Sequence, residues 1–234
     1  MIEIKKGNIF TTKCHTIVNT VNCVGVMGAG IAYEFKLRFP EMFEKYKSYC
    51  DAGLIKIGNL WIYKLTKNDN EMYEYILNFP TKTHWKYQSK EEYLEKGLQK
   101  FVDTYKEKGI LSIAFPLLGA SKGGIDEEIS IKIMKKYLEK VDINVEIWKF
   151  DPNAKDDLYE EFKDKFLNLD ETIIKEQSKL RIDLIRKIKN ALHRDDIHCM
   201  SGLLRVKGIG DVSLQKSFQF IKDFEKNNRN LFTI

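Results

Sequence analysis

The stretch Val18–Phe35, "VNTVNCVGVMGAGIAYEF", indicates the fold class of this chain. It begins as an apolar run typical of a buried strand, ends in a run with helical spacing, and carries Gly25, Gly28 and Gly30 in between. Glycines let backbone N–H groups approach a ligand closely, and a helix that starts behind them points its positive end at the same place. The stretch therefore predicts an anion-binding loop between a strand and a helix, with a tight turn that binds nothing as the alternative.

The same alternation of strand and helix continues through the first 150 residues. Short apolar runs predict strands at 1–5, 15–21, 60–65, 73–79, 110–118 and 144–150. Helical spacing predicts helices at 29–50 (interrupted by Pro40), 90–108 and 127–140, and the polar run 66–71 predicts a hairpin turn. This order is typical of a layered α/β domain with a largely parallel central sheet, in which ligands bind at the carboxyl ends of the strands.

Composition limits the class of protein. With 43% hydrophobic and 31% charged residues, the 234-residue chain has enough apolar material for a folded core. No apolar run approaches the ~18 residues of a membrane span, and the first ten residues lack the apolar core of a signal peptide. Cys14, Cys23, Cys50 and Cys199 have neither metal-type nor disulfide-framework spacing. We therefore expect a cytoplasmic protein with reduced thiols and no membrane contact.

The positive charge lies at the C-terminal end. Residues 171–234 hold eight Lys and five Arg against eight acidic residues, which equals the net charge of +5 of the whole chain. The strand pattern also ends there, and 173–192 and 213–226 have helical spacing. We expect one domain over 1–152, an acidic connector over 153–170 with a surface helix as the alternative, and a small all-α domain over 171–234. The basic end predicts a polyanionic partner, with a solvated helical surface as the alternative.

The first glycine loop differs from the common nucleotide-binding motifs. A dinucleotide fingerprint reads G-x-G-x-x-G after the first strand, whereas this loop reads G-x-x-G-x-G after the second expected strand. A Walker loop is excluded because no G-K-[ST] occurs. Two further segments, "FPLLGASKGGID" and "NFPTKTHWK", follow expected strands at the same sheet edge. Two glycine loops at one edge could hold both ends of a diphosphate.

Four segments in this order, "GNIF", "VNTVNCVGVMGAGIA", "NFPTKTHW" and "PLLGASKGGID", resemble a macrodomain of the DarG branch, which is related to the terminal ADP-ribose glycohydrolases. The resemblance covers roughly residues 1–152. It implies a three-layer α/β/α fold with a mixed, largely parallel sheet. It also implies that ADP-ribose binds across the strand ends and that no cofactor is needed.

The resemblance implies a set of ligand-binding residues. Asn8 and Ile9 are expected beside the adenine, and Asn22 beside the distal ribose. Phe150 is expected to stack on the adenine, with an ordinary core aromatic at a strand end as the alternative. The full implied set is Asn8, Ile9, Asn22, Val26, Met27, Gly28, Ala29, Gly30, Ile31, Gly119, Ala120, Ser121, Lys122, Gly123, Gly124 and Phe150.

Lys82 is the catalytic residue that the resemblance implies. An unprotonated amine can attack C1″ of the distal ribose, and an ammonium can instead donate a proton to the leaving group. Attack requires a lowered pKa, through burial or a neighbouring cation such as Lys86. His84 and Trp85 are candidate substrate contacts: Trp85 either stacks on an extruded base or packs against the loop.

The second glycine loop departs from the G-C-G-N-G-G-L-D-W common in this branch. Ser121 stands in place of a glycine, which reduces the freedom of the backbone, and Lys122 adds a positive charge suited to phosphates. Asp126 could orient Lys82 or the ribose, or it could simply begin a helix, where the dipole favours an acid.

The C-terminal stretch "LLRVKGIGDVSLQKSF" has the outline of a helix-hairpin-helix, a motif that offers backbone N–H groups to DNA phosphates. The candidate DNA-backbone contacts are Lys207, Gly208, Gly210 and Lys216. A structural helical cap is the alternative. His193, His198 and Cys199 match no standard zinc spacing, so we expect no metal.

Together the residues and the resemblance predict an ADP-ribosyl glycohydrolase that removes ADP-ribose from a nucleobase, with thymine favoured, in single-stranded DNA. The partner that the resemblance implies is a DNA ADP-ribosyltransferase toxin, which would make the protein antitoxin-like. Two alternatives remain open. One is a non-catalytic ADP-ribose reader, and the other is a hydrolase of a small derivative such as ADP-ribose 1″-phosphate.

Overall fold

The computed structural model describes residues 1–66 and 73–231, with side chains up to residue 224, and divides into two compact units, Met1–Pro152 and Asn153–Ile234. The first unit contains a six-stranded sheet in the order β1-β6-β5-β2-β4-β3. Its strands are β1 (Ile2–Gly7), β2 (Thr16–Asn22), β3 (Trp61–Lys64), β4 (Tyr75–Lys82), β5 (Ser112–Pro116) and β6 (Asn144–Phe150). All neighbours are parallel except β3 and β4, which confirms the mixed, largely parallel sheet.

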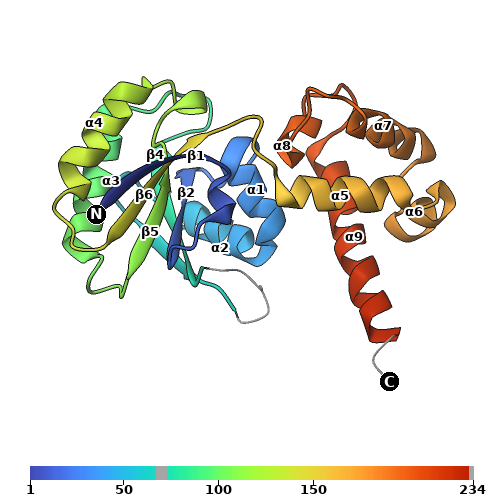
Figure 1. Cartoon of the computed structure of the whole chain (residues 1–234), viewed down its shortest axis with the longest axis horizontal. Helices are drawn as coiled ribbons and strands as arrows, with labels where there is room; N and C mark the ends of the chain where they lie inside the picture. The colour runs from blue at the N-terminus through green and yellow to red at the C-terminus, as the bar shows by residue number, and fades with distance from the viewer. Residues whose placement is uncertain (67–72, 232–234) are drawn as a thin grey trace. The chain divides into compact units, whose positions relative to one another are not determined.

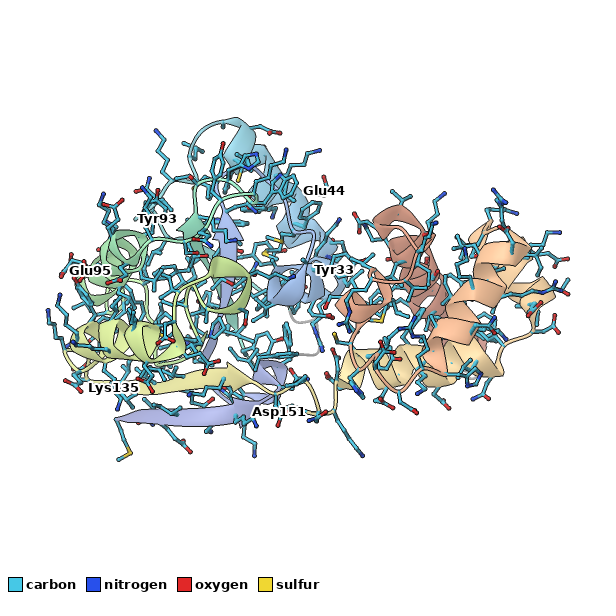
Figure 2. The ribbon with its side chains drawn as sticks, turned by 90° about the horizontal axis from the view of Figure 1, so that it is seen from above. Tyr33, Glu44, Tyr93, Glu95, Lys135 and Asp151 are labelled. Atoms are coloured by element: carbon cyan, nitrogen blue, oxygen red, sulfur yellow. The ribbon has the colours of Figure 1, made fainter. Side chains whose placement is uncertain are left out.

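Helices cover both faces of this sheet (Figure 1). On one face lie α1 (Gly30–Arg38) and α2 (Pro40–Asp51), and on the other lie α3 (Glu91–Thr104) and α4 (Glu127–Leu138). Pro40 occupies the first position of α2, where its missing N–H costs nothing, so the expected interruption separates two helices. On the outer surface, Lys136 of α4 pairs with Glu95 of α3 at 2.9 Å. Figure 2 labels Glu95 on α3 and Lys135 on the neighbouring α4. The three-layer α/β/α arrangement is confirmed.

The central strands are apolar on both faces because both faces are covered. Polar exceptions are paired across the ladder: Asn19 of β2 and Asn78 of β4 are both fully buried and opposite in register, and Asn19 Nδ2 donates to Asn78 Oδ1 at 2.9 Å. β3 and β4 form the expected antiparallel pair. The predicted turn at 66–71 lies, apart from Thr66, outside the described residues.

The described part of the second unit is helical, with α5 (Asp157–Asn168), α6 (Glu171–Ser178), α7 (Ile182–Leu192), α8 (Met200–Leu203) and α9 (Asp211–Leu231). The expectation of a connector over 153–170 is wrong, because these residues belong to the helical unit. Their acidic stretch carries Phe162 and Phe166, which are fully buried, and the ring of Phe162 lies 6.2 Å from that of Phe218 in α9. The buried aromatic face makes α5 part of a core.

The helix expected over 173–192 is two helices. Lys179 adopts a left-handed conformation with φ of 58°, which ends α6, and α7 begins at Ile182. The buried residues that predicted a helix, Ile174, Ile185, Ile188 and Leu192, are divided between the two. Within the described ranges, none of the helices combines the length and the apolar composition that crossing a membrane requires.

Candidate active site at the carboxyl ends of the strands

The parallel sheet brings three expected segments to one edge. β2 ends at Asn22 and β4 at Lys82, and these two residues are partners in the strand register. The loop after β5 runs through η3 (Ser121–Gly123) to α4. Because parallel strands end at the same edge, both glycine loops and the segment after Lys82 lie together, as the sequence predicts.

Asn22 shapes the first loop. Its Oδ1 accepts from the N–H groups of Val24 at 3.0 Å and Val26 at 3.3 Å, and its Nδ2 donates to the Val26 carbonyl. The buried Tyr46 donates its hydroxyl to the Asn22 carbonyl at 2.7 Å and reaches Oδ1 at 3.2 Å. Burial raises the pKa of Tyr46, so the hydroxyl stays a donor. Asn22 therefore fixes the loop, and only its remaining Nδ2 hydrogen is left for a ribose.

The first loop leads into an open helix end. Ala29 is the N-cap of α1 and provides no side-chain cap, so the first N–H groups of this helix have no intrahelical acceptor. Gly30 adopts φ of 57°, which favours glycine. Met27 is only 1% exposed and packs in the core beneath the loop, so the exposed residues of this loop are the ones that can meet a ligand. An open helix end beside exposed glycines is an arrangement that suits an anion.

The second loop closes on itself and on its neighbour. Within the loop, Gly123 N–H donates to Ala120 O at 2.9 Å and Gly124 N–H to Ser121 O at 3.1 Å. Ser89 N–H donates to Gly123 O at 2.8 Å, and a Cβ at Gly123 would lie 2.8 Å from Ser89 Oγ, so a larger residue there would force the Ser89 hydroxyl to move. Among the contacts of the described residues, the N–H groups of 120–122 donate to no acceptor. These successive donors suit a phosphate.

Lys82 is the register partner of Asn22 and also contacts the second loop. Its Nζ donates to the backbone carbonyl of Lys122 in the second loop. Burial, and secondly the positive charge of Lys122, lower the pKa of Lys82, in the direction expected for an attacking amine. The neighbouring cation is Lys122 and not Lys86, whose Nζ lies 5.1 Å from the centroid of the Trp85 ring.

The segment after Lys82 carries exposed rings. Trp85 is 49% exposed and stacks on His84 with the ring centroids 5.5 Å apart. Half of the Trp85 surface therefore remains available to a substrate. Sequence reasoning missed Tyr87, which is 65% exposed, and Ser89, which anchors the second loop. The run of rings in "HWKY" was the signal that could have identified Tyr87.

The three residues expected beside the adenine differ in how accessible they are. Asn8 caps η1 (Ile9–Thr11), and its Oδ1 accepts from Phe10 N–H at 3.0 Å, so part of the acceptor capacity expected for adenine is already used. Ile9 is buried in the core beside it. Phe150 is 69% exposed at the end of β6, so the alternative of a core aromatic is wrong and its ring is free to stack.

Asp126 begins a helix. Its Oδ1 accepts from Glu128 N–H at 2.8 Å and Ile129 N–H at 3.2 Å, which makes it the N-cap of α4. Of the two roles considered for Asp126, the structure supports the cap.

The hairpin in the second unit joins the four-residue α8 to α9. Gly210 N–H donates to Ser213 Oγ at 3.1 Å, so Gly210 is a weaker phosphate donor than expected. Lys207, Gly208 and Lys216 are exposed.

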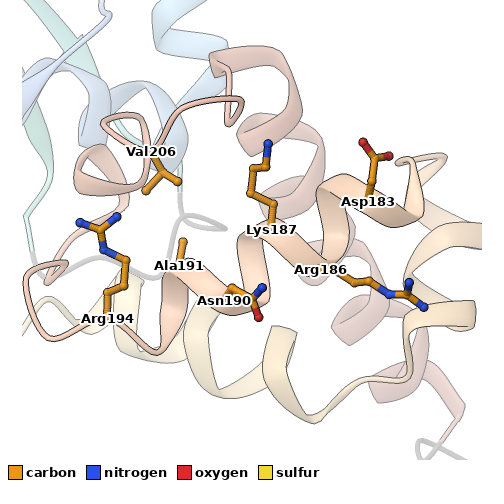
Figure 3. Close-up of a pocket in the computed structure, with 7 residues that line it drawn as sticks. All are labelled: Asp183, Arg186, Lys187, Asn190, Ala191, Arg194 and Val206. Carbon is orange, nitrogen blue, oxygen red and sulfur yellow. The ribbon is translucent and has the colours of Figure 1, made fainter.

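A cavity of about 340 Å³ opens beside α7 in the same unit (Figure 3). Two of its lining cations are paired, Arg186 with Glu171 at 2.9 Å and Arg194 with Asp196 at 2.8 Å. Lys187 also lines the cavity, and its Nζ approaches the backbone of Gly208. Over the described ranges, no group of three or more His, Cys, Asp or Glu side chains is arranged to hold a metal ion.

Comparison with known proteins gives this arrangement a family. A family model described as Macro domain matches residues 18–134. A Thermus aquaticus protein named DNA ADP-ribosyl glycohydrolase is 38% identical over 152 residues, which cover 65% of this chain and 41% of the relative. A Thermosipho africanus relative is named a DNA ADP-ribosyl transferase-DNA ADP-ribosyl glycohydrolase fusion protein. It is 32% identical over 160 aligned residues, which cover 63% of this chain and 41% of the relative. The chain thus spans about two fifths of the length of these relatives.

Solved structures agree with the fold. The macrodomain of Mycobacterium tuberculosis DarG matches with a TM-score of 0.61 at 37% identity, covering 63% of this chain and 97% of that one. Thermosipho africanus DarTG in complex with ADP-ribose matches with a TM-score of 0.58 at 34% identity, covering 63% of this chain and 41% of that one. Both matches show that the first unit has the macrodomain fold.

Proposed function

This chain belongs to the Macro domain family. On that premise we propose that it is an ADP-ribosyl glycohydrolase that removes ADP-ribose from a nucleobase in single-stranded DNA, with thymine as the favoured base. The observation that carries the proposal is the position of Lys82, a partly buried lysine that is the register partner of Asn22 and whose Nζ donates to the second loop. The names of the similar proteins support the reaction class.

Each of the two glycine loops binds one phosphate of ADP-ribose. The open N-terminus of α1 offers N–H groups and the positive end of a helix dipole to one phosphate. The N–H groups of 120–122 offer a second donor set to the other phosphate. Asn22 keeps the first loop in shape, and Phe150 provides an exposed ring for the adenine.

Lys82 is then placed to act on the distal ribose. Because burial and Lys122 lower its pKa, a larger fraction of the amine is neutral than in water. A neutral amine attacks C1″, the bond from C1″ to the base nitrogen breaks, and the leaving base takes up the proton that the newly bonded lysine nitrogen releases. Water then hydrolyses the lysine adduct, which releases ADP-ribose and restores the amine. Proton donation by the ammonium form of Lys82 is the competing role, and in that role the rate would fall, not rise, as the pH increases.

We extend the proposal to the second unit and to partners. The hairpin residues Lys207, Gly208 and Lys216 contact the phosphates of the modified strand, and the cognate partner is a DNA ADP-ribosyltransferase, as in the fusion relative. We place the activity in the cytoplasm, where the four cysteines stay free. Neutralising Lys207 and Lys216 together should make the negative slope of log affinity for DNA against log salt less steep by about 2. An unchanged slope would favour the alternative, a second unit that is only a structural helical cap.

A turnover assay with the full chain tests the function. The substrates are a single-stranded oligonucleotide ADP-ribosylated on thymine and ADP-ribose 1″-phosphate, and the readout is released ADP-ribose. The proposal predicts turnover of the oligonucleotide. Binding of ADP-ribose by calorimetry without any turnover indicates a reader, and turnover of the small derivative alone indicates the second alternative.

A further inference from the structure

Three rings follow Lys82 along the chain, two of them exposed and one, His84, half-buried. His84, Trp85 and Tyr87 lie in the turn between β4 and α3, and Trp85 and Tyr87 are 49% and 65% exposed. His84 and Trp85 stack with an interplanar angle of 27°, and the centroids of His84 and Tyr87 are 5.3 Å apart. Contiguous exposed aromatic surface, unlike scattered apolar residues, marks an interaction site.

The turn holds these rings in a fixed arrangement. Lys86 N–H donates to His84 Nδ1 at 3.2 Å, and Tyr87 N–H donates to His84 O at 3.1 Å. The turn is tied to the second glycine loop at both ends, through Lys82 Nζ before it and Ser89 N–H after it. A preorganised surface of this kind binds without the cost of ordering a loop.

The segment that carries the rings has charges of one sign, and acidic residues begin only at Glu91, the first residue of α3. The segment 82–90, "KTHWKYQSK", contains three lysines and no acidic residue. The ammonium of Lys86 lies 5.1 Å from the centroid of the Trp85 ring. Rings on which bases stack, next to a cation that meets the phosphate, are the combination that single-stranded nucleic acid requires.

We infer that this ring cluster (His84, Trp85 and Tyr87, with Lys86 at its edge) binds the nucleotide adjacent to the ADP-ribosylated one. The inference rests on the proposed function, because the modified nucleotide must occupy the site at Lys82. Trp85 is three residues beyond Lys82, so their backbones are at most about 11 Å apart. The cluster needs a base with an open face, and it therefore selects an unpaired strand.

A substrate-preference assay tests the ring cluster. The full chain is given a thymine-ADP-ribosylated oligonucleotide and the matching ADP-ribosylated thymidine, which has no neighbouring nucleotide. In the Trp85→Ala/Tyr87→Ala double variant, the ratio of kcat/KM for the oligonucleotide to that for the nucleoside should fall about 5- to 150-fold, mainly through KM, and Trp85→Phe/Tyr87→Phe should restore most of it. Equal losses on both substrates, or an unchanged ratio, would overturn the inference.

The matched control is Tyr137→Ala. Tyr137 lies at the end of α4, near the opposite edge of the sheet, and two lysine ammonium groups, those of Lys136 and Lys140, lie over its ring at 5.1 and 5.0 Å. The control should leave the substrate ratio unchanged. A comparable fall in the control would show that any ring next to lysines gives the effect, which also contradicts the inference.

A binding measurement separates this inference from the proposed function. Fluorescence anisotropy with an unmodified, labelled single-stranded oligonucleotide requires no turnover. The double variant should bind it about 5- to 150-fold more weakly than the unmutated protein, and the corresponding duplex should show no such loss. If the unmutated protein cleaves neither substrate, the proposed function fails while this measurement still decides the ring cluster. Equal binding of the strand by both proteins would overturn it.

Discussion

The two glycine loops have the same strand–loop–helix order but present different donors. The first leads into α1, whose N-cap Ala29 leaves the helix end open. The second leads into α4, whose N-cap Asp126 closes the helix end with a carboxylate. An anion at the first loop therefore meets a helix N-terminus, whereas an anion at the second meets the loop backbone at 120–122. Similar sequence patterns can thus build two kinds of phosphate contact.

The largest effect is expected when the N-terminus of α1 is given the carboxylate N-cap that α4 already has. Ala29 has the extended backbone of an N-cap, so Ala29→Asp should cap the helix and stabilise the protein by about 1 kcal/mol. Its carboxylate should lower the affinity for ADP-ribose about 5- to 30-fold by calorimetry, because it competes with the diphosphate for the helix end.

Ala29→Ser is the control for this change. It caps the helix without a charge, so it should retain more affinity than the aspartate variant. Unchanged affinity in Ala29→Asp would place the diphosphate away from α1 and remove the first half of the comparison.

The second loop can be tested through the pH dependence of Lys82. Its pKa is lowered by burial and by Lys122, so for an attacking amine kcat/KM rises with pH and levels off above that lowered pKa. Lys122→Ala removes the neighbouring cation, so the pKa of Lys82 should rise and the rising limb should move to higher pH. A rate that instead falls as pH rises would assign Lys82 the role of proton donor.

A smaller effect is expected at the closed helix end. Asp126→Ala should lower the free energy of unfolding by about 1 kcal/mol, seen as a lower Tm, because two N–H groups of α4 lose their acceptor. Asp126→Asn should retain most of this stability and full turnover. A marked loss of kcat in Asp126→Asn would restore the orienting role that the sequence left open.

The smallest effect concerns Ser121, which holds φ of 50° where similar loops carry glycine. Ser121→Gly removes the left-handed strain but adds entropy to the unfolded chain, for a net gain of about 0.5 kcal/mol. Calorimetry should show a slightly higher Tm, whereas Ser121→Ala should give none. A lower Tm for Ser121→Gly would mean that the serine side chain itself stabilises the loop.

The positions of the strands and of the site edge were predictable because they depend on local pattern and on one topological rule. Runs of buried apolar residues predict strands such as β5, and parallel strands place their ends together. The break at Lys179 was not predictable, because neither glycine nor proline marks it and a lysine rarely adopts the left-handed conformation that ends α6 there. The burial of Phe162 against Phe218 also depends on residues distant in sequence.

Within the site, residue types were predictable and their partners were not. The sequence placed Lys82 at the edge, but its contact with the Lys122 carbonyl depends on how the second loop folds. Asn22 was expected to face a ribose, and it is mostly used by its own loop because two backbone N–H groups lie within reach of its oxygen. Such assignments require the three-dimensional neighbours.

The central claim is that Lys82 cleaves the bond to the base. The most direct measurement is the single-turnover rate of ADP-ribose release from a thymine-ADP-ribosylated single strand, compared among the unmutated chain, Lys82→Ala and the matched Lys90→Ala. The account predicts a loss of at least about 100-fold for Lys82→Ala with ADP-ribose binding retained, and little change for Lys90→Ala. A Lys82→Ala rate within a few-fold of the unmutated protein would contradict it.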